Sequence, residues 1–375
     1  MLAPDQPAAV PLNLHEYEAA ARDLLSPMLY DFVAGGSGDE VTLRACQAAF
    51  ARWRLVPRVL RGLTGVSTAT SVLGQPVASP VLIAPASLHK LVHVDGELAT
   101  ARAARAAGTI YTMSTAASMS IEEVASAAGP WWFQLYVFVD RGLTRDLVAR
   151  AAAAGATALV VTVDTPVLGR READERNRFA LPPGMAMANL QAPEPVPGTV
   201  AAEGSRLTSY ASVIEPALSW VDLDWLAALA PLPVVPKGIL HAADAARAVD
   251  HGARAIIVSN HGGRQLDGAV AALDALPAIV EAVAGRGEVL LDGGVRRGID
   301  VLMALALGAR AVLIGRPIHW GLAVGGEAGV RHVLELVRTE LARDLLLCGL
   351  ASPAEVDRSL LVRAGIPIES DPASE

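Results

Sequence analysis

The pattern that decides the fold is clearest in the stretch Arg254-Ala255-Ile256-Ile257-Val258-Ser259-Asn260-His261-Gly262-Gly263-Arg264. Its apolar half is short, rich in β-branched residues and bounded by turn residues, which is typical of a fully buried strand. His261 and Arg264 therefore follow the carboxyl end of a strand, separated by glycines that let a ligand approach the backbone. Such a pair can hold an anionic substrate and move its proton, but an ordinary turn exposing both side chains has the same sequence.

Similar apolar runs alternate with helical patterns from residue 81 nearly to the end of the chain. Roughly eight strand-helix units over about 250 residues are typical of a closed (β/α)₈ TIM barrel. We therefore predict an α/β protein with its barrel at 81–350. The predicted strands are 81–86, 109–114, 131–136, 158–164, 233–237, 254–259, 288–292 and 311–315. The predicted helices are 97–107, 120–128, 143–154, 223–230, 242–251, 275–284, 299–307 and 328–347.

Three segments stand outside this alternation. Residues 1–80 contain a helical pattern over 13–50 and then short alternating pieces, which predict an N-terminal helical cover and a small hairpin. A long loop at 179–222, after the fourth strand, is rich in proline and glycine and predicts a mobile active-site lid. Residues 351–375 are expected to form a C-terminal tail.

Composition narrows the class of protein. Of the 375 residues, 52% are apolar and 19% are charged, so the chain can fold around a large core. The net charge of −8 argues against a nucleic-acid partner. Apolar runs too short to span a bilayer and a first segment unlike a signal peptide predict no membrane partner. Cys46 and Cys348 fit neither a disulfide framework nor a metal site, which favours the reducing cytoplasm.

The loops after the strands carry the residues suited to chemistry. Asp164 emerges from an apolar strand, where a carboxylate needs a partner, and an imidazole would suit it. Lys237 ends another apolar strand, either reaching to solvent or serving as a fixed positive charge. The glycine- and arginine-rich loops at 292–298 and 314–317 follow the last two strands, where barrels of this class frequently bind phosphate.

Long motifs in the same order resemble the FMN-dependent α-hydroxy acid oxidases and dehydrogenases, a family whose members act on lactate, glycolate or mandelate. The resemblance covers about 17–350 and rests on the motifs at 133–136, 162–171, 237–238, 259–267 and 291–296. It implies FMN as cofactor and oxidation of an L-2-hydroxy acid to the 2-oxo acid, by hydride or carbanion transfer. It further implies O₂ or another electron acceptor and a homotetramer.

The resemblance also assigns roles position by position. It implies that His261 is the base and Asp164 its partner, that Arg171 and Arg264 bind the substrate carboxylate, that Tyr136 contacts the substrate, and that Lys237 lies at the flavin N1/O2 edge. Positions implied to line the flavin ring or ribityl chain are Pro85, Ala86, Ser87, Ser114, Gln134, Thr162 and Ser259. Positions implied to bind the ribityl chain and phosphate are Asp292, Gly293, Gly294, Arg296, Gly315 and Arg316.

Two substrate positions depart from the pattern of many members. Phe32 stands where many have tyrosine, and Ala116 stands where glycolate oxidases have tryptophan. The resemblance therefore favours a substrate larger than glycolate, similar to lactate or mandelate.

Four alternatives remain open at this point. They are a dehydrogenase using an acceptor other than oxygen, a flavin-dependent isomerase on the same barrel, a metal-dependent aldolase, and an FMN-binding protein without catalytic activity. The small number of histidine and carboxylate side chains at the strand ends speaks against the aldolase, and no metal is expected.

Overall fold

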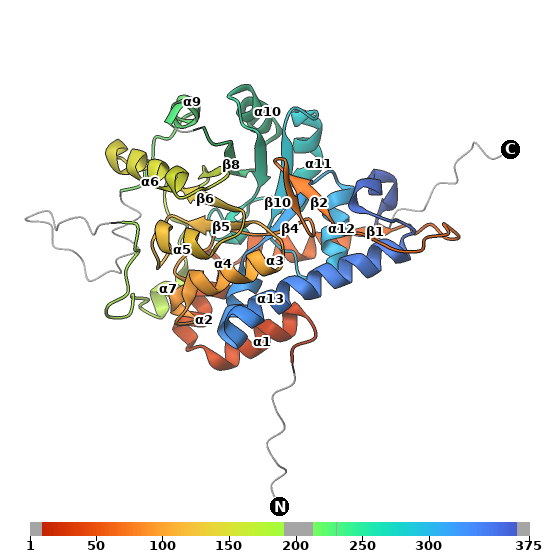
Figure 1. Ribbon diagram of the computed structural model, residues 1–375, viewed down its shortest axis with the longest axis horizontal. Helices are drawn as coiled ribbons and strands as arrows, with labels where there is room; N and C mark the ends of the chain where they lie inside the picture. The colour runs from red at the N-terminus through yellow and green to blue at the C-terminus, as the bar shows by residue number, and fades with distance from the viewer. Residues whose placement is uncertain (1–9, 191–212, 230, 366–375) are drawn as a thin grey trace, which may run out of the picture.

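A closed barrel of eight parallel strands forms the centre of the computed structural model, which describes residues 10–190, 213–229 and 231–365 (Figure 1). The strands follow the order β10-β11-β4-β5-β6-β7-β8-β9, so the predicted (β/α)₈ barrel is confirmed. Their bounds are β4 (Val81–Ile83), β5 (Tyr111–Ser114), β6 (Trp131–Leu135), β7 (Leu159–Thr162), β8 (Val234–Ile239), β9 (Ala255–Val258), β10 (Glu288–Asp292) and β11 (Ala311–Ile314).

The inner face of the barrel changes from apolar to polar toward the carboxyl ends of the strands. Successive side chains of a strand point to opposite faces, so residues two apart share a face. The apolar inner layer contains Trp132, Val160, Val235, Ile257 and Leu290, which pack in one buried cluster. Two positions further along the same strands lie the buried polar residues Gln134, Thr162, Lys237, Ser259 and Asp292. Strand periodicity alone thus gathers polar groups at one end of the barrel.

Helices surround the barrel in the order predicted, with two differences. The helix after β11 begins at Arg316, not at 328, and its interior kinks at Gly325 and Gly326, where the backbone is non-helical. A short helix, α7, also lies in the loop after β7, where the sequence pattern predicted none. The bounds are α4 (Gly96–Ala106), α5 (Ile121–Ala127), α6 (Arg141–Ala153), α7 (Glu172–Arg176), α9 (Trp220–Leu229), α10 (Ala242–Asp250), α11 (Ala272–Val283), α12 (Gly298–Ala306) and α13 (Arg316–Leu347).

The N-terminal segment covers one side of the barrel. It contains α1 (Leu14–Leu24), α2 (Pro27–Ala34) and α3 (Val41–Ala48), and α1 runs beside α13 (Figure 1). The predicted hairpin is formed by β2 (Thr70–Val72) and β3 (Gln75–Val77), and its Val72 and Val77 side chains join the apolar cluster inside the barrel. These two valines therefore extend the barrel's apolar interior.

The end of the chain returns to this segment. Strand β1 (Trp53–Leu55) pairs in antiparallel fashion with β12 (Leu361–Arg363), a pairing that no local pattern predicted. Part of the segment expected as a tail is therefore a strand. Residues 366–375 of that segment lie outside the described residues, as do 1–9 and residue 230.

The predicted lid at 179–222 is only partly described, because 191–212 lie outside the described residues. The segment before this gap is attached to the barrel by the Ala188 amide, which donates to the Ala117 carbonyl at 2.9 Å. After the gap, Ile214 forms a β-bridge with Phe138. Both flanks are thus held near the carboxyl ends of the strands.

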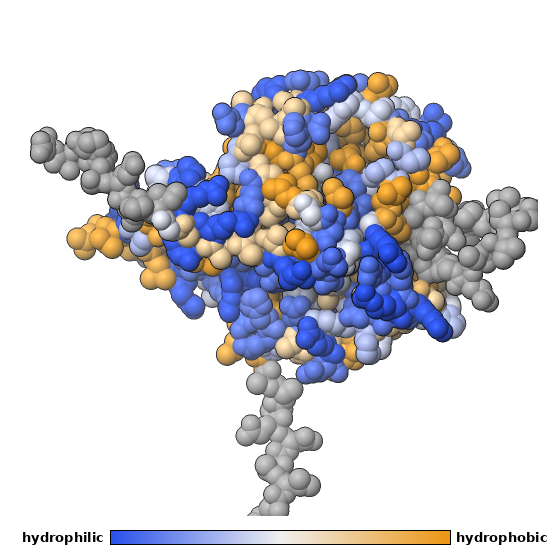
Figure 2. All heavy atoms as spheres, turned by 180° about the vertical axis from the view of Figure 1, so that it is seen from behind, coloured by the Kyte–Doolittle hydropathy of each residue, from blue (hydrophilic) through white to orange (hydrophobic). Residues whose placement is uncertain are grey.

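The outer surface mixes hydrophilic and hydrophobic residues. On the face opposite to that of Figure 1, hydrophobic residues form small patches among hydrophilic ones (Figure 2). Within the described ranges, no helix is both long and apolar enough to cross a membrane.

Candidate active site

A single cavity opens where the barrel's polar layer meets the loops after the strands. Its volume is about 1320 Å³, including space open to solvent. All but two of the residues expected at the site line it; Asp164 and Ser259 lie behind this lining. The expected residues that line it are Phe32, Pro85, Ala86, Ser87, Ser114, Ala116, Gln134, Tyr136, Thr162, Arg171, Lys237, His261, Arg264, Asp292, Gly293, Gly294, Arg296, Gly315 and Arg316.

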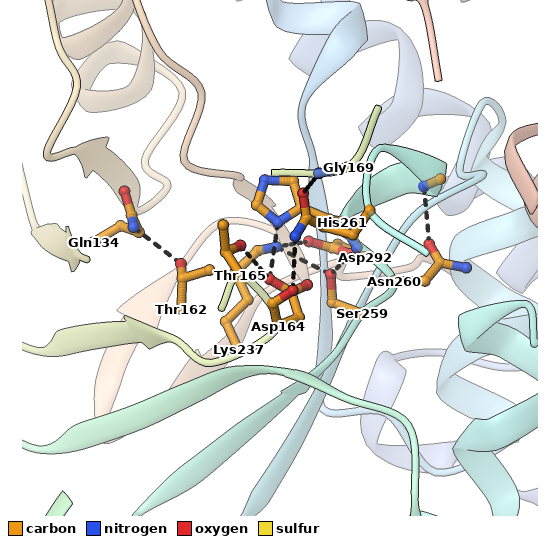
Figure 3. Close-up of polar contacts among 12 residues, drawn as sticks. Gln134, Thr162, Asp164, Thr165, Gly169, Lys237, Ser259, Asn260, His261 and Asp292 are labelled. Atoms are coloured by element: carbon orange, nitrogen blue, oxygen red, sulfur yellow. Dashed lines mark hydrogen bonds and ion pairs between the residues drawn. The ribbon is translucent and has the colours of Figure 1, made fainter. Parts of the chain in front are cut away.

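His261 and Asp164 form a hydrogen-bonded pair. Nδ1 of His261 lies 3.0 Å from Oδ1 of Asp164, and both side chains are largely buried (Figure 3). Burial alone would raise the pKa of Asp164, but His261, Lys237 and Thr165 together lower it. Burial lowers the pKa of His261, against the opposing effect of Asp164. An ionised carboxylate only accepts hydrogen bonds, so a neutral His261 carries its proton on Nδ1 and leaves Nε2 as the basic nitrogen.

The backbone around His261 is held in an unusual conformation. His261 has a φ of 58°, in the left-handed region that favours glycine, and Gly262 and Gly263 follow it with positive φ. The hydroxyl of Ser259 accepts a hydrogen bond from the His261 amide at 3.0 Å, and the Asn260 side chain accepts one from the Gly263 amide. These two side chains stabilise a turn that would otherwise be unfavourable for a histidine.

Lys237 is a buried cation on the inner face of β8. The strand continues to Ile239, so Lys237 lies within it and does not end it as predicted; an irregularity at Gly238, with a φ of 113°, accompanies the longer strand. The ammonium lies 2.9 Å from Oδ2 of Asp292 and donates to the Ser259 hydroxyl at 3.0 Å (Figure 3). Burial alone would lower the pKa of Lys237, but Asp292, Asp164 and Tyr136 together raise it. Lys237 is therefore a fixed positive charge.

Arginines collect on the side of the cavity nearest the N-terminal segment. Arg264 and Arg316 both donate to the carbonyl oxygen of Gly35, at 2.8 and 2.9 Å. Burial, together with the nearby guanidiniums of Arg171 and Arg316, lowers the pKa of Arg264 well below its usual value. The Nε atom of Arg171 is buried and makes no hydrogen bond within the part of the chain that the structure describes. Clustered, under-compensated cations of this kind favour binding of an anion.

A further set of lining residues fits FMN. Buried atoms Oδ1 of Asp292 and Nε of Arg296 lack hydrogen-bond partners among the described residues. A hydroxyl-bearing chain can donate to the first, and a phosphate can accept from the second. Gly294, at a φ of 88°, leaves no room for a side chain, because a Cβ atom there would come within 2.1 Å of the Cys46 carbonyl oxygen. Bare backbone, a carboxylate and buried arginines are the groups that a ribityl phosphate requires.

Apolar side chains form part of the cavity wall. Phe32 stacks on Phe179, with ring centroids 4.4 Å apart and an angle of 11° between the planes. Ala116 adds a small side chain to the wall. Leu168 and Ile214 also line the cavity, and neither was expected from the sequence.

His319, near the start of α13, is a further lining residue that the sequence reasoning missed. Leu168 lies in the quoted 162–171 motif and could have been noticed there. Ile214 and His319 lie in segments without a recognised motif, so no local signal marked them. Among the described residues, no cluster of three or more histidine, cysteine or acidic side chains is placed to hold a metal ion.

Comparisons with known proteins agree with this geometry. The family described as FMN-dependent dehydrogenase matches residues 21–363. The chain is 54% identical to an L-lactate oxidase from Nostoc sp. over 94% of this chain and 98% of that protein. It is 48% identical to human 2-hydroxyacid oxidase 1, over 93% of this chain and 95% of that protein.

Solved structures include a mandelate oxidase with (S)-4-hydroxymandelic acid. It superimposes with a TM-score of 0.90 and 46% identity, covering 95% of this chain and 100% of that one. The sequence resemblance, the barrel and the cavity thus point to the same group of proteins.

Proposed function

Because the chain belongs to the family of FMN-dependent dehydrogenases, we propose that it oxidises an L-2-hydroxy acid to the 2-oxo acid. FMN is its cofactor. The observation that carries the proposal is the 3.0 Å contact of Asp164 with His261, which lines the cavity where the arginines collect. A proton acceptor beside an anion-binding cluster is the arrangement that removal of a hydroxyl proton from a carboxylate-bearing substrate requires.

Arg171 and Arg264 would bind the substrate carboxylate. Guanidinium groups match the planar geometry of a carboxylate, and burial strengthens the contact. The unpaired Nε of Arg171 and the lowered pKa of Arg264 support this assignment, because both show cations that lack full compensation within the protein. Tyr136 lines the same part of the cavity and would contact the bound acid.

His261 would accept the substrate's hydroxyl proton at Nε2. Asp164 would stabilise the resulting imidazolium and hold the ring in place through Nδ1. When bound, FMN supplies the acceptor for the two electrons that leave the substrate carbon. Lys237, a buried fixed cation held by Asp292, would stabilise negative charge at the cofactor's N1/O2 edge. A carbanion route, in which His261 takes the proton on carbon, uses the same residues.

The ribityl chain and phosphate of FMN would be held by Asp292, Gly293, Gly294, Arg296, Gly315 and Arg316. The rest of the cofactor would lie along Pro85, Ala86, Ser87, Ser114, Gln134, Thr162 and Ser259. The support is that all except Ser259 line one cavity. Ser259 lies one layer behind, bonded to Lys237.

The substrate would be larger than glycolate. Phe32 offers an apolar face where a hydroxyl contact is often found, and Ala116 leaves space in the wall. The Nostoc relative is named a lactate oxidase and the solved structure a mandelate oxidase, so both substrates belong in a first test.

Molecular oxygen is the proposed acceptor, giving hydrogen peroxide, because the named relatives are oxidases. The second candidate is a dehydrogenase that uses another acceptor. A homotetramer in the cytoplasm belongs to the same proposal, and the two free cysteines, Cys46 and Cys348, are compatible with a reducing compartment. Light scattering of the purified protein tests the tetramer.

The experiment is anaerobic addition of L-lactate, (S)-mandelate and glycolate to the FMN-loaded protein. We expect loss of the oxidised flavin's visible absorbance with lactate or mandelate, more slowly with glycolate, and its return with peroxide formation when air is admitted. Reduction without reoxidation by air would support the dehydrogenase, and no reduction by any of the three would contradict the proposed reaction.

A further inference from the structure

The proposed base pair and carboxylate clamp are divided between two loops. The loop after β7 carries Asp164 and Arg171, and the loop after β9 carries His261 and Arg264. Strand β8 lies between β7 and β9 in the barrel, so no ladder of backbone hydrogen bonds joins these two strands directly. Both the base pair and the carboxylate clamp therefore depend on how one loop is placed against the other.

Gln265 joins the two loops through its side chain. Its Nε2 donates to the carbonyl oxygens of Asp164 at 2.8 Å and Val167 at 2.9 Å. Its Oε1 accepts from the amide of Gly169 at 3.0 Å. The side-chain amide of Gln265 thus uses both its protons and its oxygen in hydrogen bonds, and all three partners lie in the loop after β7. Gln265 is only 9% exposed, so losing any of these bonds would leave buried polar groups unpaired.

The two loops also touch through their backbones. A Cβ atom at Gly169 would come within 2.4 Å of the Arg264 carbonyl oxygen and 2.7 Å of the Gln265 Cα. Beneath them, a Cβ atom at Gly238 would come within 2.5 Å of the Asp164 Cβ. Glycines at both points permit this close approach, and the Gln265 amide adds polar contacts to the one between His261 and Asp164.

The neighbouring residues of the same loop have other functions. Leu266 is 74% exposed. Asp267 turns toward the N-terminal segment, where its carboxylate accepts from the amides of Val41 and Thr42 at the start of α3. Three consecutive residues thus point to three different surroundings, and Gln265 is the one whose hydrogen bonds described above reach the loop of Asp164.

We infer that Gln265 is a positioning residue of the catalytic site. By tying the loop after β7 to the loop after β9, it holds Asp164 against Nδ1 of His261. It also sets the separation between Arg171 and Arg264. The inference rests on the proposed function, because it takes His261 as the base.

A purely structural role would make a different prediction from a positioning role. Asp164 raises the pKa of His261, while burial and the cations Lys237 and Arg171 lower it. Weakening the Asp164 contact therefore lowers the pKa of His261 further. A residue that only stabilises the fold would change the melting temperature and leave this pKa unchanged.

The test compares Gln265→Met with the FMN-loaded wild type. Methionine is neutral and of similar size but makes none of the three hydrogen bonds. Labelled histidine allows NMR titration of His261 without substrate, with His261→Ala to assign the signal. We expect a lower pKa for His261, at least a tenfold loss of kcat/KM, and an unchanged FMN content. The acid limb of the pH profile of kcat/KM should move to lower pH.

Leu266→Ala is the matched control, and it should leave both the titration and kcat/KM unchanged. If Gln265→Met does not fold, Gln265→Asn takes its place. Its shorter side chain cannot reach all three partners, so the His261 pKa and kcat/KM should change in the same direction. Unchanged His261 titration and unchanged kcat/KM in a folded variant would overturn the inference. Failure of the wild type to oxidise any 2-hydroxy acid would instead count against the proposed function, and the NMR titration would still test the contact.

Discussion

Nδ1 of His261 lies 3.0 Å from Oδ1 of Asp164, although 97 residues separate the two along the chain. Because burial keeps the pKa of His261 low and Asp164 stays ionised, the imidazole is neutral near pH 7 and its free nitrogen can accept a proton. Activity should therefore fall as the pH drops through the pKa of His261.

Replacing Asp164 by Asn should reduce kcat/KM by at least about a hundredfold, because the neutral amide cannot stabilise the imidazolium and can select the wrong tautomer. The pKa of His261 should also fall, since Asp164 raises it. Measuring kcat/KM against pH checks both effects. An acid limb at the wild-type pH would show that the carboxylate does not act on this base.

Replacing Arg171 by Met should weaken binding of the acid substrate about ten- to a hundredfold, the usual effect of losing a charge-assisted hydrogen bond. The matched comparison uses the methyl ester of the same 2-hydroxy acid, which lacks the charge. If Arg171 binds the carboxylate, KM should rise much more for the acid than for the ester. Equal changes for both would place Arg171 outside the carboxylate site.

Replacing Ala116 by Trp should shift preference toward small substrates. Ala116 is 4% exposed in the cavity wall, so an indole there would fill space that a larger side chain needs. The ratio of kcat/KM for mandelate to that for glycolate should fall at least tenfold, as roughly 1–3 kcal/mol of pocket discrimination implies. An unchanged ratio would mean that the larger side chain lies elsewhere.

Replacing His319 by Leu should make the protein less sensitive to acid. His89 and His319 are buried side by side, with ring centroids 4.5 Å apart, and burial lowers their pKa values to about 4 and about 3. The ordinary value is 6.5, so the unfolded chain binds protons first and stability is lost as the pH falls below about 6.5. Each of the two histidines should therefore lower the free energy of unfolding by about 2–3 kcal/mol between pH 6.5 and pH 4.5, at about 1.4 kcal/mol per pH unit.

Unfolding by denaturant at pH 7 and pH 4.5 measures this loss. Between pH 7 and pH 4.5, the free energy of unfolding of the variant should fall by about 2–3 kcal/mol less than that of the wild type. Equal losses would show that His319 is not held neutral in the folded protein. The substitution is also of similar size, which limits the change in packing.

The sequence predicted those features that depend on local periodicity. The barrel strands were recognisable because Ile257 and Val160 belong to short apolar runs, and the polar layer followed because Ser259 and Thr162 lie two positions further on. Residues as far apart as Pro85 and Arg316 line one cavity because the carboxyl ends of all barrel strands meet at one face.

Features that depend on packing between distant segments could not be predicted. The β1–β12 pairing and the shared Gly35 carbonyl have no local pattern, because each brings together residues far apart in the chain. Ile214 lines the cavity from a segment bridged to Phe138, far from it in the chain. Periodicity locates strands, but it does not say which loop bends back over them.

The most direct test of the account is anaerobic rapid mixing of FMN-loaded wild type and His261→Ala with (S)-mandelate and with L-lactate. We predict that the wild-type flavin is reduced by at least one of them, whereas the variant keeps its bound yellow cofactor and is reduced at least about a thousandfold more slowly. Reduction of the variant at the wild-type rate would contradict the assignment of His261 as the base on which the mechanism depends.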